Sequence, residues 1–92
     1  MDIEELKKFL RVDGNDLDVV ILGYQAAAEV YLSNAGVEKD YTNALYKVVV
    51  SMVAGTFLEN PSLVVMGKGS SESLSITISA LIAQLRLSQV TI

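Results

Sequence analysis

The chain contains no cysteine and no histidine among its 92 residues. Without cysteine there is no disulfide framework, no thiolate nucleophile and no cysteine-based zinc site. Without histidine the chain lacks the commonest metal ligand and the usual general base of enzymes. We therefore expect a protein that is not an enzyme and that uses no cofactor and no metal.

Positive charge is also scarce. Seven Lys and Arg residues stand against 11 Asp and Glu residues, so the formal net charge is −4. Proteins that grip nucleic acid normally present a basic stripe that neutralises phosphates. The bases are instead scattered along the chain, at Lys7, Lys8, Arg11, Lys39, Lys47, Lys68 and Arg86. Tight DNA binding by a single copy is therefore not expected.

Long hydrophobic runs are missing as well. The most apolar segment extends from Ala44 to Leu58, and Lys47 and Ser51 interrupt it. Because a helix needs about 20 apolar residues to span a bilayer, we expect a soluble protein made in the cytoplasm, with no membrane partner.

Hydrophobic residues nevertheless make up 51% of the chain, and charged residues only 20%. This composition is typical of a folded protein and argues against disorder. The length suits a single domain over residues 1–92. Since a domain of this size buries only roughly 60–65% of its surface, so much apolar content indicates that another chain covers part of it.

Helix signals predict an all-α fold, a small bundle of about four helices. The first helix is expected over Ile3–Leu10, with Asp2 as its N-cap. After the Asp13-Gly14 turn, Asn15 is expected to cap a second helix over Asp16–Ala35. Gly36 then suits the left-handed position that ends such a helix.

Two further helices are predicted with a long loop between them. The third covers about Tyr41–Leu58, with Asp40 as N-cap and Asn60-Pro61 as its stop. In the loop over residues 61–75, the apolar segments 63–65 and 74–78 could pair as a short β-hairpin. The fourth helix begins at Ile76 or Thr77 and ends at Leu87.

Each long helix carries apolar residues on two opposite faces, whereas a globular helix usually buries one stripe. On the last helix, one face holds Ile78, Leu81, Ile82 and Leu85, and the other holds Ile76, Ala80, Ala83 and Leu87. The pattern does not say which faces point inward. The candidate intersubunit interface consists of Val19, Leu22, Ala26, Val30, Tyr46, Val50, Val53 and Phe57. The alternative is a tight bundle with the third helix in its middle.

Two segments resemble binding motifs without satisfying them. The first holds Asp13, Asn15, Asp16 and Asp18. An EF-hand that starts at Asp13 needs Gly at its sixth position and Glu at its twelfth, where this chain has Asp18 and Tyr24. In the second segment, Gly69 follows Lys68, where a phosphate loop requires Ser or Thr. We interpret the first as turn and helix-start chemistry and the second as a surface loop.

The N-terminal segment carries a specific resemblance. It reads Ile3-Glu4-Glu5-Leu6-Lys7-Lys8-Phe9-Leu10-Arg11-Val12-Asp13, then Asn15-Asp16-Leu17-Asp18 after one glycine. This segment has a short helix of the form leu-lys-x-x-leu-arg-val/ile-asp, then an acidic turn, then a long Ala-rich helix that ends near Tyr31-Leu32. It resembles the head–tail connector (adaptor) family of long-tailed double-stranded DNA phages and prophages. The segment Ser79–Arg86 is similar to the closing helix of that family, whereas the Pro-Phe-Gly-like stretch that often precedes it is absent.

The resemblance implies a structural subunit of a homo-oligomeric ring, commonly twelve-fold, in the virion neck. The ring would join the portal protein of the DNA-filled head to a head-closure or tail-completion protein, and DNA would pass through it without sequence-specific binding. The protein would be made in the host cytoplasm. Head-to-tail interfaces that close do form rings. The alternative is a small DNA-packaging or DNA-binding regulatory protein, although the second helix carries no Lys or Arg.

Overall fold

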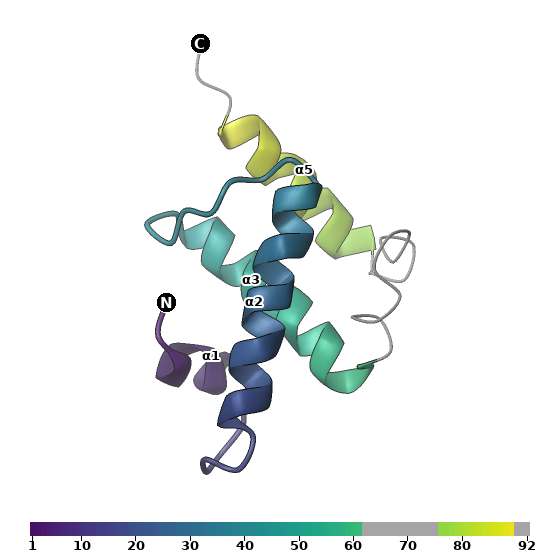
Figure 1. Ribbon diagram of the computed structural model, residues 1–92. Helices are drawn as coiled ribbons and strands as arrows, with labels where there is room; N and C mark the ends of the chain where they lie inside the picture. Colours follow the sequence, from purple (N-terminus) through teal and green to yellow (C-terminus); the bar gives the residue numbers. More distant parts are fainter. Residues whose placement is uncertain (62–75, 90–92) are drawn as a thin grey trace.

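The computed structural model describes residues 1–61 and 76–89. Over these residues the chain forms four α-helices and no strand (Figure 1), which confirms the all-α prediction. The helices are α1 (Ile3–Leu10), α2 (Asp18–Asn34), α3 (Ala44–Glu59) and α5 (Ile76–Ser88). In this described part of the chain, no helix is both long and apolar enough to cross a membrane.

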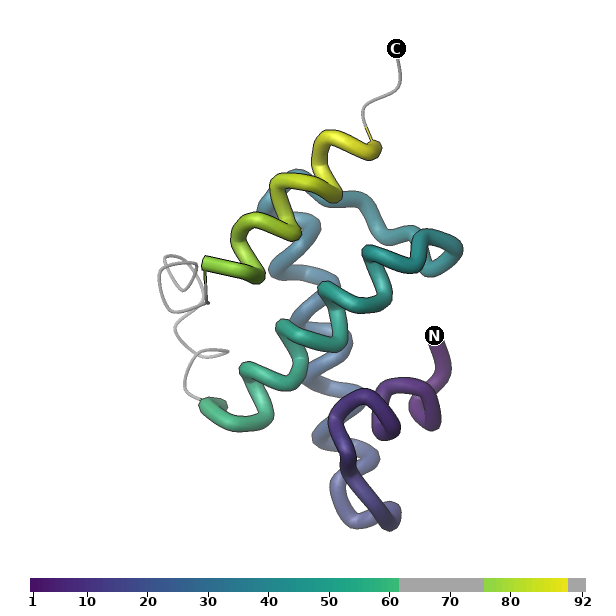
Figure 2. The backbone as a smooth tube through the Cα atoms, turned by 180° about the vertical axis from the view of Figure 1, so that it is seen from behind, coloured from purple at the N-terminus to yellow at the C-terminus, as the bar shows by residue number. Residues whose placement is uncertain are grey.

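Helix α3 lies in the middle of the bundle and packs against α1, α2 and α5. Figure 1 shows α2 crossing in front of α3, and Figure 2 shows α3 and α5 side by side, running in opposite directions. Helix α3 contributes more residues to the described core than any other helix, namely Tyr46, Val49, Val50, Val53, Ala54 and Phe57. A helix that is apolar all round is stable only where neighbours cover it on several sides. The sequence analysis left open a tight bundle with the third helix in its middle, and the structure has this arrangement.

The first helix has the predicted bounds and cap. The side chain of Asp2 accepts a hydrogen bond of 2.9 Å from the backbone N–H of Glu5. Its C-terminal end is closed by Arg11, which has a left-handed conformation with φ of 60°. The N–H of Val12 donates to the carbonyl of Lys7 at 3.0 Å, the closing bond of a Schellman motif. Arg11 occupies the position where glycine is usual.

The second helix begins two residues later than predicted, at Asp18. Asn15 does not cap it, because the side chain of Asn15 accepts a hydrogen bond of 3.0 Å from the ammonium of Lys7. Lys7 is only 5% exposed, and its ammonium also lies 2.9 Å from a carboxylate oxygen of Asp18. These contacts fasten α1 to the first turn of α2. At the other end, Gly36 has φ of 92° and stops the helix as predicted.

The third helix begins at Ala44, three residues later than predicted. Asn43 is its N-cap and accepts hydrogen bonds from the backbone N–H groups of Leu45 and Tyr46. Asp40 instead accepts a hydrogen bond from the N–H of Thr42, so it stabilises the turn before the helix. Both residues are good capping types, so the sequence pattern alone does not choose between them.

The predicted last helix is confirmed as α5, Ile76–Ser88. The proposed β-hairpin falls mostly on residues 62–75, which lie outside the described residues. Its final part, residues 76–78, is the first turn of α5, so no strand reaches that far. The end of α5 is fixed by Gln89, whose side-chain amide exchanges two hydrogen bonds of 2.8 Å with the backbone of Glu38.

Substituting Arg11→Gly should raise the free energy of unfolding by about 0.5–1 kcal/mol, because glycine has no Cβ to oppose a positive φ. The matched variant Arg11→Ala keeps the Cβ and should give no such gain. Urea unfolding followed by circular dichroism measures both. Equal stabilisation by the two variants would show that the arginine side chain, not the backbone conformation, carries the cost.

Candidate functional site

The most prominent surface feature is an uncharged apolar strip along the outer side of α2. It consists of Val19, Leu22, Gly23, Ala26 and Val30, and we call it the α2 strip. At 100° per residue these positions lie opposite the buried side of the helix. All five are exposed, including 84% of Val19, 50% of Leu22 and 59% of Val30. No other helix lies in front of α2 in Figure 1. The α2 half of the predicted interface is therefore free to make contacts.

The α3 half of that prediction is wrong. Tyr46, Val50 and Val53 have no exposed surface, and Phe57 is only 3% exposed. The aromatic ring of Phe57 packs against the rings of two α2 tyrosines, with centroid distances of 6.5 Å. These four residues belong to the core of the subunit, because α3 is covered by the other helices. They are not available to a second copy.

A second apolar strip lies on the outer side of α5. It consists of Ile76, Ala80, Ala83 and Leu87, which we call the α5 strip. All four are exposed, 88% for Ile76 and 70% for Leu87. The opposite face of α5 supplies buried residues to the core. Of the two apolar faces of the last helix, one is therefore buried and the other exposed. The interface predicted from the sequence did not include residues of this exposed face.

A polar cluster joins the 35–43 connection to α2. The hydroxyl of Tyr41 donates to the carboxylate of Glu29 and accepts a hydrogen bond of 3.0 Å from the amide of Gln25. The ammonium of Lys39 lies 3.7 Å from the same carboxylate and 5.8 Å from the centre of the Tyr41 ring. Tyr46 meets Tyr41 edge to face, with ring centroids 5.1 Å apart. The cluster holds the connection against α2.

The hydroxyl groups of the two tyrosines in this cluster have raised pKa values. Burial raises the pKa of the Tyr46 hydroxyl to about 12, and the negative charge of Glu29 adds to this effect. Burial also raises the pKa of Tyr41 well above its ordinary value, and Glu29 raises it further, while the Gln25 hydrogen bond partly opposes the rise. A nucleophile or general base needs a lowered or near-neutral pKa. The cluster is therefore suited to holding structure in place.

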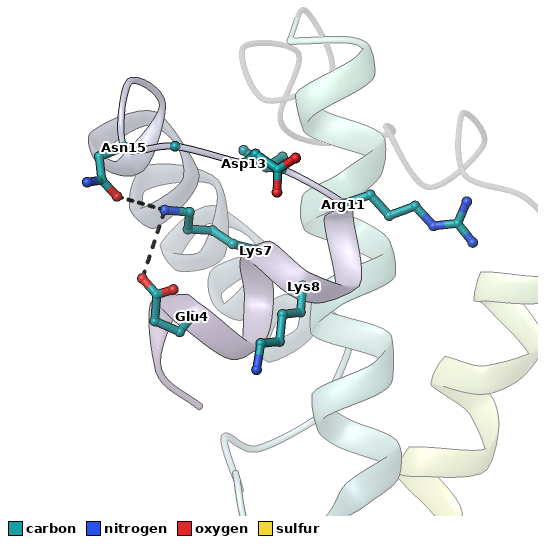
Figure 3. Close-up of a pocket in the computed structure, with 8 residues that line it drawn as sticks. Glu4, Lys7, Lys8, Arg11, Asp13 and Asn15 are labelled. Carbon is teal, nitrogen blue, oxygen red and sulfur yellow. Dashed lines mark hydrogen bonds and ion pairs between the residues drawn. The ribbon is translucent and has the colours of Figure 1, made fainter.

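A shallow hollow lies beside α1, near the N-terminus. Figure 3 shows Lys7 reaching Asn15 and Glu4, while Lys8 and Arg11 point in other directions. The charges that line the hollow are of both signs, and Lys7 is already engaged by its neighbours. The hollow therefore does not concentrate charge of one sign that could select a ligand.

The described residues offer little to a metal or to nucleic acid. They hold no group of three or more acidic side chains positioned for a metal ion. Among their bases, Lys7, Lys39 and Lys47 each face a carboxylate. The remaining ones, Lys8, Arg11 and Arg86, lie on α1, just after it, and on α5, so they form no continuous basic stripe.

Comparison with models of known protein families, with curated protein sequences and with solved structures gave no match. The candidate site is accordingly defined by the geometry of this chain alone. It is the pair of outward apolar strips on α2 and α5.

Substituting Tyr41→Phe should lower the free energy of unfolding by about 1–2 kcal/mol, because it removes a hydrogen bond to a charged carboxylate. Its matched control is Tyr46→Phe, since the buried Tyr46 hydroxyl has no hydrogen-bond partner among the described residues. That change should leave stability equal or slightly higher. Denaturant unfolding at neutral pH compares them. A larger loss for Tyr46→Phe than for Tyr41→Phe would contradict the assigned roles.

The stability of the protein should fall as the pH rises above about 10, the pKa of a tyrosine in the unfolded chain. The folded state holds the Tyr46 proton up to a pKa of about 12. The folded state therefore binds more protons over this interval, and its stability decreases with pH. Tyr46→Phe cannot titrate there and should lose less stability between pH 10 and 12. Parallel stability curves for the two proteins would exclude this linkage.

Proposed function

We propose that this chain is a structural subunit of a homo-oligomeric ring in a phage neck. In this role it joins the portal protein of the DNA-filled head to a head-closure or tail-completion protein and lines the passage for DNA. Its contribution is mechanical and involves no catalytic step. The proposal combines the resemblance of the N-terminal segment with the character of the molecular surface.

The observation that carries the proposal is the exposed α2 strip. Five consecutive outward positions over three turns of α2 carry no charge, and three of them are Val or Leu with half or more of their surface exposed. Contiguous apolar surface on a small protein commonly marks a contact with another protein. A ring subunit needs such a surface on each copy.

The charge of the chain supports passage of DNA rather than a grip on it. Its formal net charge is −4, and the described bases are mostly paired or dispersed. An acidic subunit repeated around a lumen repels phosphates at long range. This favours sliding of DNA through the ring, and it gives no support to the alternative of a DNA-binding regulator.

The test is a mass measurement in solution, by light scattering after size-exclusion chromatography, for the protein alone and mixed with the portal protein of its phage. We expect a complex with many copies per portal ring. Val30→Asp should abolish this complex while keeping the helical circular dichroism spectrum, because Val30 is on the α2 strip and charge there opposes burial.

The matched control is Val50→Asp, which places the same charge in the core. It should lose helicity, since an unpaired buried charge costs several kcal/mol and small domains have little stability to spare. A wild-type protein that stays monomeric and does not bind the portal would refute the proposed function. Val30→Asp assembling as the wild type does would show that the α2 strip does not make the contact between subunits.

A further inference from the structure

Four of the five α2 strip residues repeat the spacing and the order of side-chain sizes of the α5 strip. They are Val19, Gly23, Ala26 and Val30 on α2, against Ile76, Ala80, Ala83 and Leu87 on α5. Both sets follow i, i+4, i+7 and i+11, with large residues at the ends and small ones between, and the fifth α2 residue, Leu22, lies beside this line. Each strip is about 16 Å long at 1.5 Å per residue. Alternating steps of four and three are the spacing at which two helices pack along a seam.

The middle of each strip lets a neighbouring helix approach closely. A Cβ added at Gly23 would meet no atom within 4 Å apart from its chain neighbours and the backbone of its own helix, so packing among the described residues does not explain the glycine. On the other strip, a shallow hollow is lined by Gly36, Ala83, Arg86 and Leu87. A hollow beside small residues such as Gly36 and Ala83 accepts a large side chain from a partner, as holes accept knobs in helix pairs.

The two helices also carry opposite charge. Helix α2 has two acids, Asp18 and Glu29, and no base, whereas the only charged residue of α5 is Arg86. Arg86 lies near the C-terminal end of α5, is exposed, and makes no ion pair within the described part of the chain. The start of α2 is acidic, with the exposed Asp16 just before it. Opposite charges therefore meet when the two helices run antiparallel.

The two orientations differ in which carboxylate Arg86 meets. In the antiparallel orientation it approaches Asp16, which makes no ion pair within the described residues, while Lys7 already contacts the neighbouring Asp18. In the parallel orientation it would approach Glu29 together with Lys39, which lies 3.7 Å from that carboxylate, and like charges across an interface oppose association.

We propose that the α2 strip of one copy packs antiparallel against the α5 strip of the next copy. This inference rests on the proposed self-association and specifies its geometry. Val19 then faces Leu87, Ala26 faces Ala80, and Val30 faces Ile76. Because the two strips belong to different helices, the contact is head-to-tail, and each added copy leaves one strip free until the chain of subunits closes.

A single contact of this kind is small. Two strips about 16 Å long on helices roughly 10 Å wide fall well short of the ~800 Å² per partner of a standard stable interface. A pair of free subunits should therefore dissociate readily, and assembly should become stable when the ring closes or when the copies line up on a portal.

Disulfide trapping tests the proposal directly, because the natural chain has no cysteine. The variants are Ala26→Cys and Ala80→Cys, both on exposed positions, oxidised separately and as a mixture in the portal-bound assembly. The mixture should yield roughly tenfold or more linked dimer than either variant alone, since facing thiols have a high effective concentration. The double variant should give a ladder of linked chains. Lys8→Cys, exposed on α1 and outside both strips, replaces Ala80→Cys in the control mixture.

The outcomes separate the two proposals. Efficient linking of Ala26→Cys with itself would replace the head-to-tail contact by a symmetric α2–α2 contact. Linking no better than the Lys8→Cys control, in a sample that assembles, would overturn the α2–α5 contact and leave the ring function standing. Higher yield with Ala83→Cys than with Ala80→Cys would overturn the antiparallel orientation. A sample that never assembles would refute both proposals.

A second variant checks the contact without cysteine. Gly23→Leu should keep or raise the stability of the subunit, because leucine favours helix over glycine and the space around Gly23 is open. The same side chain should weaken assembly by at least tenfold in the concentration required, since it holds the α5 helix of the next copy away. Unchanged assembly would count against the proposed contact.

Discussion

The constraint on which the whole structure depends is the apolar character of α3. Six of its residues are buried in the core, from Tyr46 to Phe57, and a helix of this kind needs cover on several sides. The chain provides that cover with α1, α2 and α5. Each of these helices packs against α3 with only one of its faces. The outer apolar sides of α2 and α5 therefore stay exposed, with no partner in the part of the chain that the structure describes.

The molecule therefore exposes two different apolar strips, one on α2 and one on α5. A single self-complementary patch leads to a symmetric dimer, whereas two different patches lead to a ring or a filament. The strips match in spacing and length, and the charges of their helices are opposite. The core requirement of α3 and the proposed assembly thus draw on the same supply of apolar residues, which make up 51% of the chain.

Polar contacts decide where the helices begin and how they are joined. The ammonium of Lys7, a residue only 5% exposed, contacts the side chains of Asn15 and Asp18. Asn15 therefore does not cap α2, and the helix begins later than predicted. The hydrogen bonds of Tyr41 with Glu29 and Gln25 fasten the 35–43 connection to α2. These side chains look like ordinary caps and surface residues in the sequence. Their partners lie 8 to 16 residues away, which local patterns do not reveal.

By itself, the sequence determined the helical class, the order of the helices, the cap at Asp2 and the stop at Gly36, because period, capping and backbone preferences act between near neighbours. It also determined that some apolar faces would remain outside. Only the tertiary structure decided which faces these are. It placed Tyr46, Val50, Val53 and Phe57 inside and left the outer sides of α2 and α5 exposed. Two opposite apolar faces of one helix are equivalent in the pattern, and the packing of the other helices around α3 makes them different.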